Sequence, residues 1–294
     1  MTHYVVKVTW KVAPLQEGSD MQPRYFVIGA DDPEMRCMVG ILNARHEMII
    51  EAKVNGSRVH PSNAYDGNNA NEIVGTGSDI ITIECAVSGV VPTKVIDHHR
   101  PGDPGYGLGP DRFWEASSLG QLCRYLKIAD VPHGFRVMAA MDHCYGAAME
   151  GLCPGVTPEE VHDLKVREIA RKRGVSTDYV IRQIQAYVDV LNDNAGTPIP
   201  TVVIGDQEVA CIPDTGIGYT LEYLCAQVAA IMAGKPVLIR VRDRENAPYR
   251  RHLCGKVNRE TIDHFLDKWV PEQGLVKPYG NPERGYAGAK EPAT

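Results

Sequence analysis

The sequence predicts an α/β protein in which a parallel-sheet domain is joined by a helical linker to a smaller α/β domain. Strand-like and helical runs alternate over residues 24–99, two charged amphipathic helices follow, and a second α/β pattern begins at residue 199. Such alternation is typical of parallel sheets with crossover helices. The expected parts are a first domain over residues 1–155, a helical linker over 156–197 and a second domain over 198–294.

The elements follow from the chain in order. Strand-like runs of the first domain occupy residues 24–32, 48–54, 79–87 and 93–99, and residues 1–12 also alternate like a strand. Helical patterns occupy residues 35–47 and 115–126, and an apolar stretch follows at 134–151. Thr157 and Ser176 each open a linker helix as an N-cap. The second domain is expected to contain strands at 200–206 and 236–242, helices at 220–235 and 258–270, and a glycine-rich tail at 277–289.

Composition excludes several classes of protein. The chain has 294 residues, a net charge of -6 and eight scattered cysteines without a C-x-x-C pair. The charge argues against broad coating of nucleic acid, and the cysteine spacing argues against a zinc knuckle or a disulfide framework. No apolar run approaches the roughly 18 residues that span a bilayer, and no secretion signal begins the chain. We therefore expect a cytoplasmic protein with buried free thiols and no membrane partner.

Acids and histidines follow three of the predicted strands. They are Asp31-Asp32, Glu84 and Asp97-His98-His99. Sites in parallel sheets form at the carboxyl ends of strands, where the loops converge. Carboxylates and imidazoles together suit a divalent ion such as Mn or Mg, which polarises a phosphoryl oxygen. The Arg-Pro-Gly that follows breaks the strand and lets both histidines face the site.

The segment IDHHRPGDPG, residues 96–105, resembles the third motif of the DHH phosphoesterase superfamily, and RecJ-type exonucleases in particular. The segment DIITIECA resembles the strand of the second motif, with Glu84 where an aspartate is expected. Residues 115–126 resemble the helix after DHH in oligoribonuclease-like members, with Ser117 and Ser118 in place. The segment RVMAAMDHCYGAAMEG resembles the fourth motif, with Asp142 as its acid.

The C-terminal part is similar to a DHHA1 substrate-binding domain, so the resemblance spans roughly residues 24–290. The segments that carry it are VLIRVRD and YGNPERGYAGA. Asn281 stands at the family's histidine position, and Arg242 stands where the family keeps an arginine. The resemblance implies substrate contacts from Arg242, Gly280, Asn281, Arg284 and Gly285, together with Ser117 and Ser118.

The family's first motif, H-x-x-P-D-x-D, is the main departure. The first strand ends in GADDPEM, which offers Asp31 and Asp32 but no histidine. The segment HPSNAYDGN offers His60 and Asp66 as a second candidate. Its closeness to Glu84 leaves little room for a crossover, so Asp31 and Asp32 are preferred as metal ligands. The metal site is therefore expected to be altered.

The resemblance also implies roles for the remaining site residues. His98 would ligate a metal, and Asp97 would ligate it or orient an imidazole. His99 and Arg100 would face the phosphate. Glu84 would bridge two metals, and Asp142 would complete the second.

The expected function is metal-dependent hydrolysis of a small nucleotide, a short oligonucleotide or a cyclic dinucleotide between the two domains. The expected metal is Mn, with Mg as the alternative, and the partner is a small nucleotide or short single-stranded nucleic acid. A homodimer is an expectation by analogy with compact members. The alternative is a DHH-like protein that has lost turnover and binds or sequesters a nucleotide.

Other polar residues leave alternatives open. His143 could reach the site or be a core histidine. Arg240, Arg242 and Arg244 share a strand face and could bind phosphate or pair with acids. The remaining residues of this kind are expected at the surface: His46, His162, Arg250, Arg251, His252 and His264.

Overall fold

The computed structural model describes residues 24–73, 79–192, 196, 198–213, 215–216, 220–242, 245 and 247–292. The strand-like segment at residues 1–12 and Arg244 lie outside the described residues. By their contacts, the described residues form two compact units. The first unit runs up to Tyr106 and includes Ala116–Val131, and the second unit holds Gly107–Glu115 and the chain from Pro132 onward. The predicted domain boundaries after residues 155 and 197 stay predictions.

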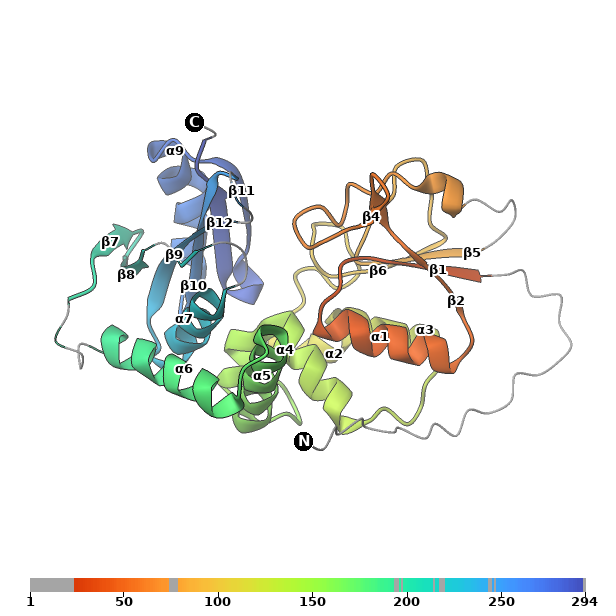
Figure 1. Ribbon diagram of the computed structural model, residues 1–294, viewed down its shortest axis with the longest axis horizontal. Helices are drawn as coiled ribbons and strands as arrows, with labels where there is room; N and C mark the ends of the chain where they lie inside the picture. Colours follow the sequence, from red (N-terminus) through yellow and green to blue (C-terminus); the bar gives the residue numbers. More distant parts are fainter. Residues whose placement is uncertain are drawn as a thin grey trace, which may run out of the picture. The chain divides into compact units, whose positions relative to one another are not determined.

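A four-stranded parallel sheet forms the centre of the first unit, in the order β2-β1-β5-β6 (Figure 1). The predicted α/β class with a parallel sheet is therefore confirmed. Its strands are β1 (Arg24–Ile28), β2 (Met48–Glu51), β5 (Asp79–Ile83) and β6 (Lys94–Ile96), and a short hairpin follows β2 as β3 (Lys53–Val54) and β4 (Ser57–Arg58).

Helices α1 (Pro33–Ala44) and α3 (Ser118–Tyr125) lie side by side against this sheet (Figure 1). On β1, Phe26 contacts the Tyr125 ring of α3, whereas the neighbouring Val27 packs into a separate apolar cluster. That cluster includes Ala64 and Cys85 and lies near the 3-10 turn η1 (Ala70–Glu72). Because consecutive strand residues point to opposite faces, both faces of the sheet are buried. Because both faces are apolar, polar side chains of this sheet are expected at the ends of its strands.

Helical segments fill the middle of the chain. They are η2 (Pro110–Arg112), α2 (Phe113–Ala116), α4 (His133–Met149), α5 (Pro158–Arg173) and α6 (Thr177–Leu191). Both predicted caps are confirmed: Thr157 forms a capping box with Glu160, and the Ser176 hydroxyl accepts the Tyr179 N–H at 3.2 Å. These bonds satisfy backbone donors that a helix leaves without partners in its first turn.

The second unit contains a six-stranded mixed sheet in the order β11-β12-β10-β9-β8-β7. Its strands are β7 (Thr201–Ile204), β8 (Gln207–Ile212), β9 (Pro236–Arg242), β10 (Tyr249–Gly255), β11 (Val276–Asn281) and β12 (Tyr286–Lys290). Its helical segments are α7 (Leu221–Met232), α8 (Arg259–His264), the π-helical η3 (Phe265–Trp269), α9 (Val270–Glu272) and η4 (Pro282–Arg284). The glycine-rich tail thus forms a strand, a short turn of helix and a second strand.

The two faces of this sheet have separate cores. Along β9, Val237 and Ile239 pack into a cluster with α5, α6 and α7, whereas Leu238 packs into a cluster with Phe265 and Trp269. On strand β10, His252 is only 8% exposed, so the prediction that it lies at the surface is wrong.

Among the described residues, no helix is both long and apolar enough to cross a membrane.

Candidate metal centre

Glu84 and the Asp97-His98-His99 triplet lie at the carboxyl ends of two neighbouring strands of the first unit. Strands β5 and β6 are parallel, with Ile83 paired to Ile96. Glu84 follows the first strand and Asp97 the second, and the Glu84 N–H donates to the Ile96 carbonyl at 3.1 Å. Side chains that follow paired positions in parallel strands emerge at the same edge of the sheet. The strand pairing therefore brings Glu84 next to the Asp97-His98-His99 triplet.

The backbone at Glu84 is left-handed, with φ of 51°. A non-glycine residue in this region is strained by about 1–3 kcal/mol and persists only where surrounding structure holds it. Gly29, at the end of β1, provides such a constraint, because a Cβ atom there would lie 2.3 Å from the Glu84 carbonyl oxygen. The close approach of the two strand ends therefore requires glycine at position 29.

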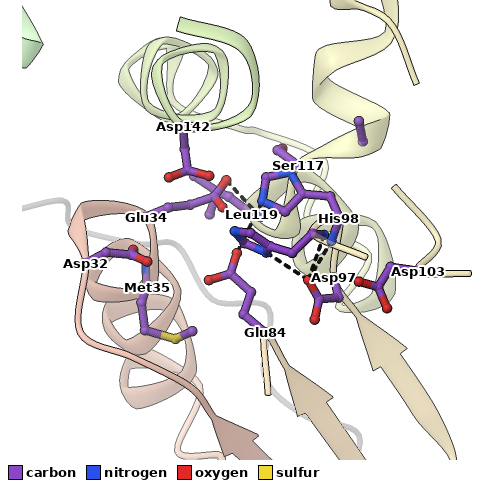
Figure 2. Close-up of polar contacts among 12 residues, drawn as sticks. Asp32, Glu34, Met35, Glu84, Asp97, His98, Asp103, Ser117, Leu119 and Asp142 are labelled. Carbon is purple, nitrogen blue, oxygen red and sulfur yellow. Dashed lines mark hydrogen bonds and ion pairs between the residues drawn. The ribbon is translucent and has the colours of Figure 1, made fainter. Parts of the chain in front are cut away.

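Glu84, His98 and His99 form a compact group of ligand atoms. Each residue offers one such atom, and these atoms lie within 4.8 Å of one another. The His98 Nε2 lies 3.5 Å from the Glu84 Oε1, and Figure 2 shows the two side chains directed toward each other. Both residues are buried. Two imidazoles and a carboxylate make a donor set that suits Mn, Zn or Fe and accepts Mg less readily.

One carboxylate oxygen tests whether a cation fits this group. The Glu84 Oε1 is buried and accepts no hydrogen bond from the described residues. A buried carboxylate is strongly destabilising unless a cation or hydrogen-bond donors compensate its charge. A divalent ion held by Glu84 and His98 would supply that compensation, so the residues fit a metal.

Asp97 does not belong to this group of ligand atoms, and hydrogen bonds engage both of its carboxylate oxygens. Its Oδ1 accepts from the His98 N–H at 2.7 Å and the His99 N–H at 3.1 Å, and it lies 2.9 Å from the His99 Nδ1. Its Oδ2 accepts from the Tyr65 hydroxyl at 2.9 Å. Burial alone raises the pKa of Asp97, but the hydrogen bond and charge of His99 and the Tyr65 hydroxyl outweigh burial and lower it. Asp97 is therefore an anion that orients His99, and direct metal ligation by it stays a prediction.

The loop after the histidines is fixed to the first unit. The Arg100 N–H donates to the Asp103 Oδ2 at 2.7 Å, and the Gln121 Nε2 donates to the Asp97 carbonyl at 2.9 Å. A Cβ on Gly105 would lie 2.0 Å from the Ala116 carbonyl oxygen and 2.7 Å from the His98 Cβ. The second glycine of the R-P-G-D-P-G segment is thus needed for the loop to close over His98.

The acids after β1 already have protein partners. The Asp32 carboxylate caps α1 by accepting the Met35 N–H at 2.7 Å, and the exposed Asp31 lies 3.3 Å from the Arg36 Nη1. The group of ligand atoms among the described residues includes neither. Their role as metal ligands stays a prediction. Glu34 is fully buried instead, and its Oε1 accepts the Leu119 N–H at 3.2 Å (Figure 2).

Ser117 and Ser118 are both fully buried. The Ser117 hydroxyl caps α3 by accepting the Gly120 N–H at 3.1 Å. A capping hydroxyl is held by its own helix, so it explains the serine without a ligand. Substrate binding by the two serines stays a prediction.

Asp142 lies on α4 in the second unit, beside the tail. The Arg284 Nη2 donates to the Asp142 carbonyl at 2.7 Å and lies 3.8 Å from the Asp142 Oδ2. Helix α4 is kinked two residues later, where Cys144 has φ of -151° and ψ of 58°. The neighbouring His143 is buried and its Nε2 lies 2.9 Å from the Leu108 carbonyl oxygen, as a core histidine would. Because Asp142 and Glu84 belong to different units, their predicted common site stays a prediction.

The tail residues are held by their own turn. The Asn281 side chain accepts the N–H groups of Glu283 and Arg284 at 3.1 and 3.2 Å. Gly285 ends the turn with φ of 71°, and Gly280 lies against the backbone of β12. The predicted substrate contacts of Gly280, Asn281, Arg284 and Gly285 stay predictions.

The arginines of β9 differ in their partners. Arg240 forms two bonds to the Glu291 carboxylate, at 2.8 and 2.9 Å, and lies 3.4 Å over the Tyr249 ring. Arg242 donates to the Tyr249 hydroxyl and lies 4.0 Å over the same ring. These arginines were expected either to bind phosphate or to pair with acids, and Arg240 pairs with an acid. The predicted substrate contact of Arg242 stays a prediction.

Sequence reasoning missed Tyr65 and His252. Tyr65 belongs to HPSNAYDGN, the segment considered for His60 and Asp66, but those two residues are exposed and Tyr65 reaches Asp97. Burial and the charge of Asp97 raise the pKa of Tyr65. His252 lies 3.0 Å from the Gln227 Nε2 and 3.4 Å from the Tyr279 hydroxyl. Arg250 and Arg251 precede His252 and made its segment look exposed. Tyr65 could have been noticed, because it lies between His60 and Asp66 in a segment already considered for the site.

Comparisons with known proteins give structural neighbours only. No protein-family model and no curated protein matches this sequence. RecJ from Thermus thermophilus in complex with Mn2+ is similar, with 12% identity, a TM-score of 0.45, and 92% of this chain and 49% of that chain covered. Its Mg2+ complex gives 12% identity and a TM-score of 0.37, with 92% and 47% covered. The pGpG-specific phosphodiesterase PggH from Vibrio cholerae is similar with 11% identity and a TM-score of 0.37, and the match covers 92% of each chain.

The resemblance to the DHH superfamily rests on the motifs of this chain, such as IDHHRPGDPG. The chain spans about half the length of the RecJ chains that it matches. At this identity and these TM-scores the similarity establishes no activity.

Proposed function

We propose that the chain is a divalent-metal-dependent phosphoesterase that hydrolyses a small nucleotide, a short oligonucleotide or a cyclic dinucleotide. The observation that carries this proposal is the group of Glu84, His98 and His99 ligand atoms at the ends of β5 and β6. The buried Glu84 Oε1 supports it, because it accepts no hydrogen bond from the described residues. A cation would compensate this charge.

Glu84 and His98 would hold the ion, with His99 beside them. The imidazole and carboxylate donors favour Mn, and Mg is the alternative. Such an ion would supply Lewis-acid activation of a phosphoryl oxygen and of the water that attacks phosphorus.

The chain's own residues would position the substrate phosphate. Asp97 engages the His99 Nδ1, so it fixes the imidazole and leaves the Nε2 for the phosphate or the ion. His99 and Arg100 would then stabilise negative charge that develops on the phosphoryl oxygens. In the second unit, Asp142 would complete a second metal, and Arg242, Asn281 and Arg284 would bind the rest of the nucleotide.

A second candidate is a DHH-like protein that binds or sequesters a nucleotide without turnover. The acids after β1 favour it, because Asp32 caps α1 and Asp31 pairs with Arg36. A site without these ligands would hold fewer ions than a two-metal site. Metal content separates the candidates: a chain with one ion or none that still binds nucleotides but hydrolyses none supports sequestration.

The test is hydrolysis by the Mn-loaded chain. The substrates are adenosine 3′,5′-bisphosphate, short RNA, short single-stranded DNA, a linear dinucleotide and a cyclic dinucleotide. We expect the wild type to release product from at least one of them, and His98→Ala to lose that activity. The exposed His60 provides a matched control, and His60→Ala should act as the wild type does. Equal rates for the wild type and His98→Ala on every substrate would overturn the proposal.

A further inference from the structure

Tyr65 contacts two neighbours of the candidate metal centre at once. Its hydroxyl donates to the Asp97 Oδ2 at 2.9 Å, and the Arg100 guanidinium carbon lies 3.5 Å from the centre of its ring. All three residues belong to the first unit. A single side chain thus holds both an acid and a cation that follow β6.

The backbone on both sides of Tyr65 is clamped to the strand extension after Glu84. The Ala86 N–H donates to the Ala64 carbonyl at 3.3 Å, and the Gly67 N–H donates to the Ala86 carbonyl at 3.1 Å. A Cβ on Gly67 would lie 2.8 Å from the Ala86 carbonyl oxygen, so the approach requires glycine. Ala64 is also buried in the apolar cluster of this unit. Tyr65 is therefore presented from a fixed backbone.

Through its hydroxyl, Tyr65 acts on His99. The Asp97 Oδ1 is engaged by the backbone N–H groups of His98 and His99 and by the His99 Nδ1, which leaves the Oδ2 for Tyr65. With both oxygens held, the carboxylate plane is fixed, and with it the orientation of the His99 imidazole.

Through its ring, Tyr65 acts on Arg100. The Arg100 side chain is 48% exposed, and its Nε lies 4.0 Å from the Asp103 Oδ2. An exposed arginine samples many rotamers, and ordering it opposes binding. Stacking on the ring restricts the guanidinium before any ligand arrives, since a cation lies favourably over an aromatic face.

We propose that Tyr65 is a positioning residue that orders His99, through Asp97, and Arg100, through its ring, for one phosphate group of the substrate. This role rests on the proposed function, because it assigns the two ordered groups to a phosphate. It also gives the HPSNAYDGN segment a task in the site without metal ligation by His60 or Asp66.

Two substitutions separate the hydroxyl from the ring. Tyr65→Phe keeps the platform under Arg100 and removes the donor to Asp97, whereas Tyr65→Leu removes both. Tyr179 in the second unit is a matched control in its Phe and Leu variants, because it is 40% exposed and Arg182 lies 5.9 Å over its ring. The four variants are compared with the wild type for kcat and KM, and for the affinity of the Mn-loaded protein for inorganic phosphate by calorimetry.

The expected results differ between kcat and KM. Tyr65→Phe should lower kcat about tenfold with KM within about twofold, since one hydrogen bond to a charged group is lost. Tyr65→Leu should in addition raise KM, and weaken phosphate binding, about three- to fivefold, since the stacking of Arg100 is lost. A purely structural tyrosine would instead lower the melting temperature and leave KM and phosphate affinity unchanged.

The phosphate titration keeps this inference separate from the proposed function. A wild type that hydrolyses none of the substrates overturns the proposed function, but the titration still decides the role of Tyr65. Weaker phosphate binding by Tyr65→Leu alone supports that role. Equal phosphate affinity for the wild type, Tyr65→Leu and Tyr179→Leu overturns it.

Discussion

Ionisable groups are arranged differently in the two units. In the first unit, Glu84, Asp97 and His98 are buried together at the ends of two parallel strands, and the Glu84 Oε1 accepts no hydrogen bond from the described residues. In the second unit, charges lie along the mixed sheet and meet each other, as Arg240 and Arg251 do at the Glu291 carboxylate.

The two units therefore differ in where a further cation would be favourable. A buried carboxylate oxygen without a donor is compensated by a metal or another cation, whereas an arginine paired with a carboxylate gains little from a further ligand. In the first unit, the Glu84 Oε1 beside the His98 Nε2 is therefore the place where a further cation would be favourable. A phosphate that binds the arginines of β9 would have to replace contacts that the second unit already makes.

The largest expected effect is on metal binding by the first unit. Glu84→Gln keeps the side-chain shape and removes its charge, so we expect Mn affinity to fall more than about 100-fold, since loss of outer partners of a metal ligand already costs about 10–100-fold. Calorimetric titration with Mn measures it. The control is Glu72→Gln, in an exposed residue that pairs with Lys53 in the same unit. Unchanged Mn affinity in Glu84→Gln would show that Glu84 does not bind the ion.

A smaller effect concerns a buried histidine of the second unit. Burial, then the charge of Arg250, lowers the pKa of His252 to about 3, so the folded imidazole stays neutral. The unfolded histidine titrates near pH 6.5, so between about pH 6.5 and 3 the unfolded chain binds more protons. The contribution of the neutral His252 to the free energy of unfolding should therefore be fully present above pH 6.5. It should fall as pH drops, by about 2 kcal/mol between pH 6.5 and 5.

Denaturant unfolding of the second unit across this pH range provides the measurement. His252→Gln should flatten the dependence on pH by that amount, whereas the control His264→Gln should retain the wild-type slope. Identical slopes in all three proteins would show that His252 binds its proton as readily in the folded chain as in the unfolded chain.

The smallest effects separate the two arginines of β9. Arg240→Gln should lower the free energy of unfolding by about 1 kcal/mol or less, as for a partly exposed ion pair, and leave KM unchanged. Arg242→Gln should raise KM about fivefold, the equivalent of one hydrogen bond to substrate. Melting curves and steady-state kinetics test the pair. Equal KM values for both variants would remove Arg242 from the substrate contacts.

Sequence patterns predicted the parts of the fold that depend on local spacing. The apolar runs of β5 and β6 end directly before Glu84 and Asp97. Because Ile83 pairs with Ile96, the two acids emerge at the same edge of the sheet. Thr157 and Ser176 were recognisable as caps because a cap acts on residues two or three positions away. Strand β10 was missed, since Arg250 and Arg251 make its first half polar.

The parts that depend on distant contacts could not be predicted. Tyr65 is 32 residues from Asp97, and its place depends on backbone bonds to Ala86 that no local pattern encodes. The carboxylate of Asp32 could ligate a metal by its chemistry, yet it accepts the Met35 N–H at the start of α1. Residue type indicates which chemistry is available, but competing hydrogen bonds decide which side chains remain for a ligand.

The contact between Gly29 and the Glu84 carbonyl also gives a marker for recognising similar chains. Any side chain at position 29, even a methyl group, would push the end of β1 and the turn at Glu84 apart. A related sequence with a larger residue there must have rebuilt the turn after β5. Glycine at this position should therefore be retained in chains that keep this turn after β5.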